Sequence, residues 1–226
     1  MRIGQWLRQI GSEGIEGLFA HKYDEFARSP VSMAHYRRIA AEVAQRVQSG
    51  KILEIGPGPG YIAIEIAKLL PEAEIVGLDV ARTMVEIASR NAEEAGVADR
   101  VSFRLGNAAQ MPFPAESFDF VVSSGSLHHW KEPIGIFNEV YRVLKDGGEA
   151  LIGDLRRDAP RELKDELAAG IDSWLMRWGL RHSFSEAHTR DELLEMLAQT
   201  SFSDYEVTED GAGLTITLRK PSRQSE

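Results

Sequence analysis

The feature that most constrains this chain is a five-residue turn, Gly-Pro-Gly-Pro-Gly, at positions 56–60. It separates an apolar run at 51–55 from an amphipathic run at 61–70. Glycine permits positive φ angles and leaves no Cβ in the way of a ligand, whereas proline fixes φ and removes an N–H group. By itself, such a turn predicts a tight crossover from a strand to a helix.

The rest of the chain continues this alternation and predicts an α/β fold. Short apolar strands alternating with helices are typical of a doubly wound, Rossmann-like sheet that is mostly parallel and has helices on both faces. The last two apolar runs flank Asp-Gly-Ala-Gly at 210–213, which predicts an antiparallel hairpin that completes seven strands. Glycines at 96 and 147–148 are interpreted as helix C-terminal signals and Pro133 as a first helical residue. The expected strands are 51–55, 74–79, 101–105, 118–123, 149–154, 202–210 and 214–220, and the expected helices are 61–70, 83–95 and 133–144.

Two segments lie outside this pattern. Residues 1–50 are expected to form helices around 21–28 and 33–47 that pack at the sheet edge and cap the ligand site, after a short helix with Trp6, Leu7 and Ile10 on one face. Within the main domain, 51–226, the segment 156–188 has no strand signal and is interpreted as a helical lid or as plain packing. Its Trp174, Trp178 and Phe184 indicate an aromatic wall or, equally, core.

Composition narrows the classes of function. The net charge of −9 disfavours nucleic acid as a partner. The absence of cysteine excludes disulfides, thiolate metal sites and a cysteine nucleophile, and fits a cytoplasmic protein. The N-terminal residues have no long apolar core, so neither a signal peptide nor a membrane span is expected there. The oligomeric state is left open.

The chemistry of the turn predicts the kind of ligand. A phosphate cradle uses converging backbone N–H groups, and two of these are lost at the prolines. No Gly-Lys-Ser/Thr follows, and the spacing is GxGxG rather than the dinucleotide GxGxxG. Glu54 ends the first strand and Asp79 ends the second, where a carboxylate can accept ribose hydroxyls. A ligand with a ribose and a cationic group is expected, and S-adenosylmethionine meets that description.

At this point the sequence resembles the class I S-adenosylmethionine-dependent methyltransferases, of the small-molecule, type 11-like kind. The resemblance is carried by "LEIGPGPG", "VGLDVA", "RLGNAAQMPFPAESFDFVVSSGSLHHW" and "VLKDGGEALIGD". It implies that the cofactor, S-adenosylmethionine, is held by Tyr23, Glu54, Gly56, Gly58, Gly60, Asp79, Val80, Met84, Asn107, Ala108 and Ser124.

Some of these implied roles have structural alternatives. The family more often has Asp than Asn at position 107, although an amide oxygen can still accept a hydrogen bond from the adenine amino group. Asn107 could instead cap a turn, and Tyr23 could be a core aromatic.

Methyl transfer needs orientation and a dry site more than a catalytic constellation. A base is required only when the acceptor is protonated, and His128 and His129 are the candidates because they follow the fourth strand. The alternative is that one histidine packs and the other bonds the backbone. No metal site is expected.

The sequence therefore predicts an enzyme that methylates a small-molecule acceptor by in-line displacement. A fold relative that binds S-adenosylmethionine or S-adenosylhomocysteine without methylating, as a regulatory module, is the alternative. A nicotinamide-dependent oxidoreductase is disfavoured by the two prolines. The sequence "SSGSLHHW" after the fourth strand, in place of an Asn-Pro-Pro-Tyr motif, disfavours methylation of nucleic-acid bases or protein glutamine.

Overall fold

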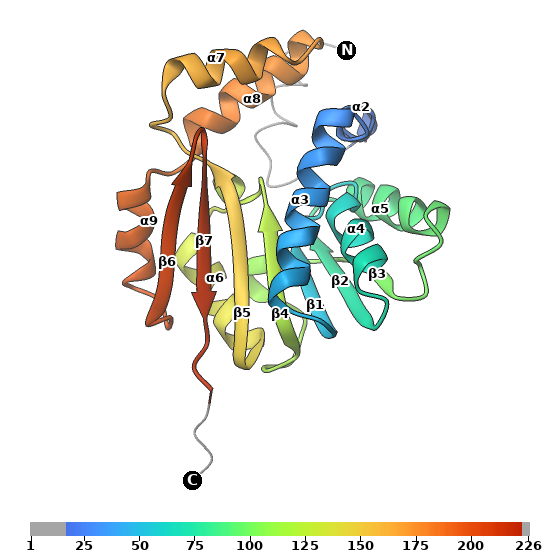
Figure 1. The fold of residues 1–226 in the computed structure, drawn as a ribbon, viewed down its shortest axis with the longest axis vertical. Coiled ribbons are helices and arrows are strands. Elements are labelled where there is room, and N and C mark those ends of the chain that lie inside the picture. The colour runs from blue at the N-terminus through green and yellow to red at the C-terminus, as the bar shows by residue number, and fades with distance from the viewer. Residues whose placement is uncertain (1–16, 223–226) are drawn as a thin grey trace.

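A seven-stranded sheet runs through the middle of the structure, a computed structural model that describes residues 17–222 (Figure 1). Its strand order is β3-β2-β1-β4-β5-β7-β6. The first five strands are parallel, β7 is antiparallel to β5, and β6 is antiparallel to β7. This confirms the predicted fold, including the C-terminal hairpin.

The elements follow each other as the sequence pattern predicts, with few exceptions. The strands are β1 Gly50–Ile55, β2 Ala73–Asp79, β3 Val101–Leu105, β4 Phe118–Ser124, β5 Leu144–Leu155, β6 Asp204–Asp210 and β7 Gly213–Arg219. The helices are α2 Gly17–Ala27, α3 Pro30–Arg46, α4 Tyr61–Leu69, α5 Arg82–Glu94, α6 Pro133–Val143, α7 Arg161–Ala169, α8 Trp174–Glu186 and α9 Arg190–Leu197, with short 3₁₀ turns η1 Ala108–Gln110 and η2 Leu127–His129.

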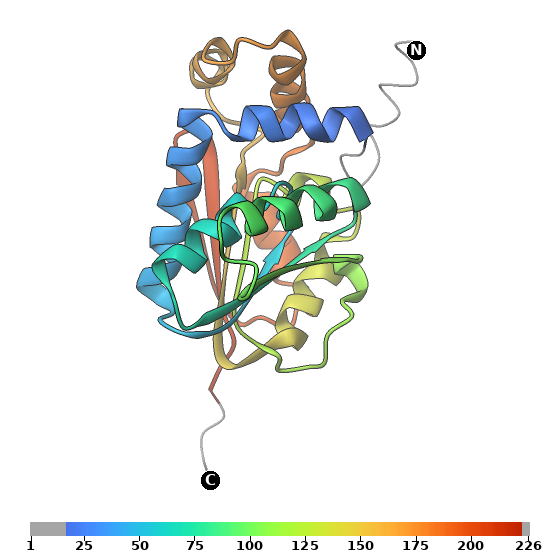
Figure 2. The same ribbon diagram turned by 90° about the vertical axis from the view of Figure 1, so that its right-hand side faces the viewer.

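Both faces of the sheet are buried, because successive strand residues point to opposite sides. In β1, Ile52 packs with α3 and α4 on one face, whereas Leu53 packs with α6 and α9 on the other. Figure 2 shows the helices on either side of the sheet. Two-sided burial explains why the central strands are continuous apolar runs rather than alternating ones.

The structure corrects three expectations from the sequence. Helix α3 packs on the face of the sheet and not at its edge, because its apolar residues Ile39, Ala40 and Val43 join the cluster that includes Val122 of β4. Gly147 and Gly148 do not end α6, because this helix already ends at Val143 and both glycines lie within β5. Helix α9 was not expected, although Thr189 and Glu192 form the capping box that marks its start.

The parallel strands end together beneath two helical segments. Ile55 of β1 lies level with Leu78 of β2 and with Ser123 of β4. The chain reverses its winding direction between β1 and β4, which is the place where doubly wound sheets bind ligands. Helix α2 and the α7–α8 hairpin lie over this end of the sheet (Figures 1 and 2). The expected short helix around Trp6 lies outside the described residues.

Candidate active site

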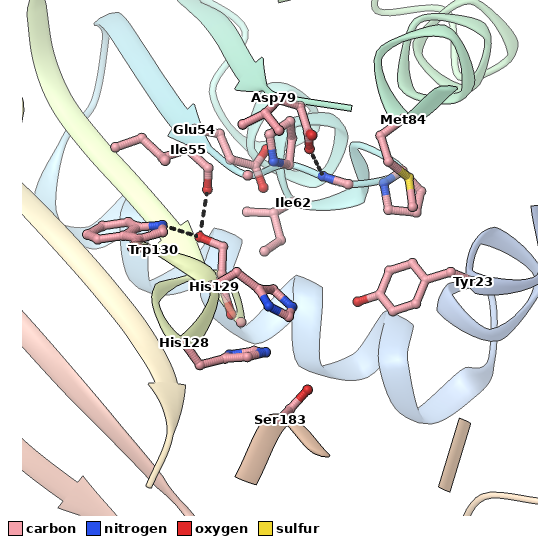
Figure 3. Close-up of a pocket in the computed structure, with 18 of the residues that line it drawn as sticks. Tyr23, Glu54, Ile55, Ile62, Asp79, Met84, His128, His129, Trp130 and Ser183 are labelled. Atoms are coloured by element: carbon pink, nitrogen blue, oxygen red, sulfur yellow. Dashed lines mark hydrogen bonds between the residues drawn. The ribbon is translucent and has the colours of Figure 1, made fainter. Parts of the chain in front are cut away.

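A cavity of about 320 Å³ lies at the carboxyl ends of the parallel strands (Figure 3). The turns that follow β1, β2 and β4 line it from the sheet side, and η2 borders it as well. Helices α2, α3 and α8 contribute further walls, and residues of α4, α5 and α6 also reach the cavity. The cavity therefore occupies the crevice in which the sequence placed the ligand.

The glycine turn uses all of its own hydrogen-bond donors. Gly56 and Gly60 donate their N–H groups to backbone carbonyls, each at 2.9 Å. Gly58 donates its N–H to Oδ2 of Asp79 at 3.1 Å. Because the other two positions are prolines, the turn offers no N–H group to an anion. A pyrophosphate cradle is therefore excluded at this turn.

Glycine is required at the three positions of the turn for different physical reasons. All have positive φ angles, of 65°, 52° and 84°. A Cβ added to Gly56 would come within 2.7 Å of Ser126, and one added to Gly60 within 2.6 Å of Phe103. At Gly58 the nearest atom would be 3.7 Å away, on the ring of Tyr23, which is an ordinary van der Waals contact, so only the positive φ disfavours a side chain there. Gly56 and Gly58 line the cavity, whereas Gly60 does not.

Two carboxylates lie beside the turn. Glu54 is 1% exposed, and its Oε2 accepts a hydrogen bond from the N–H of Ala63 at 3.0 Å. Burial raises the pKa of Glu54 to about 8, and the nearby charge of Asp79 adds to the rise. Asp79 is 8% exposed and accepts hydrogen bonds from Gly58 and from the N–H of Ala81. A cation that approached Glu54 would favour its ionised form, so this end of the cavity suits a positively charged ligand.

The residues expected to contact adenine lie together at one end of the cavity. Val80 is 39% exposed although apolar, and Met84 is buried beside it. Asn107 and Ala108 also line the cavity. The side-chain oxygen of Asn107 accepts from the N–H of Ala109 at 2.8 Å, so Asn107 does cap the turn η1. Ser124 also lines the cavity, with its Oγ 3.5 Å from Nε2 of His35.

Tyr23 points from α2 into the cavity (Figure 3). Burial raises the pKa of its phenol, and the neighbouring Tyr36 acts in the opposite direction. Tyr23 also packs against the small cluster formed by Ala20, Met84 and Ile87. It is therefore both a packing residue and part of the cavity wall.

A buried polar network fastens α2 to the glycine turn. The carboxylate of Asp24 accepts hydrogen bonds from the Tyr61 hydroxyl at 2.8 Å and from Nδ2 of Asn91 at 3.1 Å. Nδ2 of Asn91 also contacts the carbonyl of Pro59 at 2.9 Å. Arg28 donates to both Asp24 and Asn91. Residues from α2, α4 and α5 thereby hold the turn in one position.

His128 forms a buried pair with Asp154 at the end of β5. The two carboxylate oxygens of Asp154 lie 2.8 and 3.0 Å from Nδ1 of His128. Asp154 also accepts the backbone N–H of His128 at 2.8 Å. Nδ1 must carry a proton to bond a carboxylate, so in the neutral form of the ring the lone pair is on Nε2. That nitrogen is buried at the cavity wall and has no hydrogen-bond partner among the described residues.

His129 differs from its neighbour. Its ring centroid is 4.0 Å from that of His128. Burial, together with the neighbouring His128, lowers the pKa of His129 to about 4. His129 lines the cavity as a neutral and weakly basic side chain.

The wall formed by α8 is not the aromatic one expected. Trp174 is 74% exposed, and neither Trp174, Trp178 nor Phe184 lines the cavity. Trp178 instead stacks on His182, and Phe184 is a buried residue outside the cavity lining. From the segment 156–188, the cavity is lined by Ile171, Met176, Gly179, Leu180, His182 and Ser183. Leu155, the residue before this segment, also lines it.

The sequence reasoning missed several residues of the site. Asp154 was within a quoted motif but received no role, although an acidic residue at the end of a parallel strand beside two histidines was a usable signal. Tyr36 and Ser183 had no local signal. Ser126 was also missed, and its Oγ accepts a hydrogen bond from the indole of Trp130 (Figure 3).

Within residues 17–222, no group of three His, Asp or Glu side chains is arranged to hold a metal ion. No helix in the same range has the length and apolar character needed to cross a bilayer.

Comparison with known proteins places this site in a family context. Residues 53–152 match the protein family described as "Methyltransferase domain". The chain is 37% identical over 115 residues to an erythromycin 3''-O-methyltransferase of Saccharopolyspora erythraea, and 36% identical over 104 residues to a 27-O-demethylrifamycin SV methyltransferase of Amycolatopsis mediterranei. These matches cover 51% and 46% of this chain and 38% of each relative, so the chain spans well under half of their length.

Solved structures extend the similarity beyond the central domain. A Methanococcus maripaludis protein provisionally described as an S-adenosyl-L-methionine-dependent methyltransferase superposes with a TM-score of 0.77, at 27% identity over 95% of both chains. The [4+2]-cyclase SpnF shares the fold, with a TM-score of 0.65 at 24% identity over 82% of this chain and 81% of its own.

Proposed function

We propose that this chain, whose residues 53–152 match a methyltransferase domain, is an S-adenosylmethionine-dependent methyltransferase that methylates a hydroxyl group of a small, neutral and largely apolar molecule. The two relatives above bear names that describe methylation of antibiotics, one of them explicitly at oxygen. The observation that carries the proposal is the free, buried Nε2 of His128 at the cavity wall, opposite to an Nδ1 that is fixed by Asp154.

The cofactor would be held at the end of the cavity next to β1 and β2. Asp79 would accept hydrogen bonds from the ribose hydroxyls, and Glu54 would balance the positive charge. Val80 and Met84 would contact the adenine, with Asn107 and Ala108 at its edge, and Ser124 would contact the methionine end. Tyr23 would cover the cofactor from α2. Every N–H group of the glycine turn already has a partner within the protein, which supports a cationic ligand over a dinucleotide.

When bound, S-adenosylmethionine supplies a methyl group whose bond to sulfur breaks as the bond to the acceptor oxygen forms, and S-adenosylhomocysteine leaves. Nε2 of His128 accepts the hydroxyl proton. Asp154 keeps the imidazole in the required tautomer and stabilises the imidazolium that forms. His129 is too weakly basic to share this role, because its pKa is lowered to about 4.

The hairpin of α7 and α8 acts as a lid in this proposal. Nε2 of His128 is shielded from solvent even though it borders the cavity. An acceptor can reach it only if part of the wall moves. Helix α8 is the wall element next to η2. The α7–α8 hairpin is joined to the sheet at a narrow base, where the backbones of Arg156 and His188 form an isolated β-bridge.

The first experiment tests the cofactor. Calorimetric titration with S-adenosylmethionine and S-adenosylhomocysteine should give micromolar binding, which the Asp79→Ala variant should weaken at least about tenfold through the loss of charge-assisted hydrogen bonds. Binding of NAD(H) in place of both ligands would reject the proposal.

The second experiment tests the base. His128→Gln should bind S-adenosylhomocysteine like the wild type but transfer methyl groups about 10²–10⁴-fold more slowly to hydroxyl compounds. Undiminished turnover in this variant would rule out His128 as the base. Cofactor binding by the wild type without transfer to any acceptor in a broad panel would favour the non-methylating alternative.

A further inference from the structure

Ser183 presents a second unpartnered polar group to the space beside His128. Its side chain points from α8 into the cavity, in the space bordered by His128, His129 and Tyr23 (Figure 3). The N-terminal cap of α8 is Ser173, and Ser185 donates its hydroxyl to the carbonyl of His182. The hydroxyl of Ser183, by contrast, makes no hydrogen bond with any described residue, although its backbone carbonyl accepts from Ala187.

We propose that Ser183 is a specificity-determining residue, whose hydroxyl donates a hydrogen bond to the same acceptor oxygen that gives its proton to His128. This rests on the function proposed above and defines its acceptor. One wall of the cavity supplies the lone pair of Nε2, and the facing wall supplies an O–H donor. Both groups are unpaired within the described residues, but only Nε2 of His128 is fully buried, where the lack of a partner is costly; Ser183 is partly exposed.

His128 and Ser183 together favour an oxygen nucleophile over a nitrogen nucleophile, because the two atoms differ in their number of lone pairs. A hydroxyl oxygen has one proton to give to Nε2 and two lone pairs. One lone pair accepts the hydrogen bond from Ser183 while the other attacks the methyl carbon. A neutral amine has a single lone pair, which cannot accept from Ser183 and attack at once. The arrangement therefore orients a hydroxyl and penalises an amine of the same shape.

The surroundings of Ser183 define the body of the acceptor. Apart from His182, the other residues that α8 and the loop before it contribute to the cavity are apolar, namely Ile171, Met176, Gly179 and Leu180. This wall has no carboxylate, lysine or arginine facing the cavity. A neutral phenol or alcohol on an apolar scaffold fits this wall, and the lysine that lines the cavity, Lys131, follows η2 and is not part of α8.

The test compares matched acceptors in matched variants. Wild type, Ser183→Ala, Ser183→Thr and Ser185→Ala are assayed with aromatic phenols and the corresponding anilines, such as 3-hydroxyquinoline and 3-aminoquinoline. Binding of each compound to protein saturated with S-adenosylhomocysteine is measured by calorimetry, which needs no turnover. Alanine is the best helix former, so both alanine variants should fold.

The expected result is a change in selectivity. Ser183→Ala should lower kcat/KM and the binding constant for the hydroxyl compounds about tenfold, in keeping with the loss of one hydrogen bond, and leave those for the amines within about twofold. Ser183→Thr, which keeps the hydroxyl, should restore most of the preference, and Ser185→Ala should behave like the wild type. Equal losses for hydroxyl and amine compounds in Ser183→Ala, or no loss for either, would overturn the role of Ser183 while leaving the methyltransferase function intact. Intact S-adenosylhomocysteine binding with no methylation of any hydroxyl compound by the wild type would overturn both.

Discussion

The two helical walls of the cavity are attached to the sheet in opposite ways. Helix α2 is fastened by a buried carboxylate, because Asp24 bonds Tyr61 of α4 and Asn91 of α5. The hydrogen bonds and ion pairs recorded for residues 161–186 all stay within residues 157–187. The hairpin of α7 and α8 therefore meets the rest of the described structure through apolar contacts and its narrow base, and it stands above the sheet in Figure 1.

This difference matches two different tasks. A wall held by buried hydrogen bonds keeps a fixed shape, which suits a cofactor that never varies. A wall with few buried residues can open at lower cost, and in α7 and α8 only Ala168, Met176 and Phe184 are buried. We infer that α2 pre-organises the cofactor end and that the α7–α8 hairpin adapts to the acceptor.

The largest effect is expected where the fixed wall is broken. Asp24→Ala removes the carboxylate that accepts hydrogen bonds from Tyr61, Asn91 and Arg28, although Asn91 keeps its contact with the carbonyl of Pro59. The free energy of unfolding should fall by about 3 kcal/mol, measured by urea denaturation. Affinity for S-adenosylhomocysteine should fall about tenfold as well, because Asn91 also contacts Pro59 of the glycine turn.

Glu25→Ala is the matched control, since Glu25 is the next residue of α2 and is exposed. It should change stability by less than about 0.5 kcal/mol. Equal effects of the two substitutions would mean that α2 is not held by the Asp24 network, and the contrast between the two walls would disappear.

The fixed wall and the adaptable wall also differ in how far the sequence predicted them. The turn, Glu54 and Asp79 were predictable because each follows from a local pattern, a strand that ends at a turn with a carboxylate at its tip. The seven strands, and the change from parallel strands to an antiparallel C-terminal hairpin, followed from hydrophobic runs in the same way. The network around Asp24 was not predictable, because its partners lie 37 and 67 residues away along the chain.

The acceptor side shows the same limit more strongly. His128 was a candidate from its place after β4, but its pairing with Asp154 joins residues 26 positions apart. Trp174 and Trp178 suggested a wall by residue type alone, yet the cavity is lined by Met176, Leu180 and Ser183 instead. Which side of a helix faces a cavity depends on how the helix docks, and the α7–α8 hairpin has no strong amphipathic pattern tied to a sheet that would fix this in advance.

A second prediction sharpens the comparison at the cofactor end. Glu54→Gln keeps an oxygen that can accept from Ala63 but removes the charge. Affinity for S-adenosylmethionine should fall about tenfold, because a charge-assisted interaction is lost. In the wild type, a cation bound near Glu54 should displace the proton that burial retains up to about pH 8. Calorimetry in buffers with different ionisation enthalpies should detect this proton release in the wild type and none in the variant.

The same residue makes a stability prediction with a definite sign. The folded pKa of Glu54, about 8, is raised above its ordinary value of 4.5. The stability linked to the protonated carboxyl is therefore complete below pH 4.5 and is lost as pH rises through about 8. Without ligand, the melting temperature of Glu54→Gln relative to the wild type should increase from pH 5 to pH 9. A constant difference across that range would show that Glu54 is ionised in the free protein.

The smallest effect is expected on the adaptable wall. Leu180→Ala shortens a partly exposed side chain that lines the cavity from α8. Because the hairpin is tied to the sheet by apolar contacts, the free energy of unfolding should change by less than about 1 kcal/mol and the affinity for S-adenosylhomocysteine by less than about twofold. KM for an apolar hydroxyl acceptor should nevertheless rise, since the apolar area that this acceptor buries is reduced. Leu167→Ala, at an exposed position of α7 outside the cavity, should leave KM unchanged. If Leu180→Ala weakened cofactor binding as much as Asp24→Ala does, the two walls would form one cooperative unit, and the division between a fixed cofactor side and an adaptable acceptor side would be wrong.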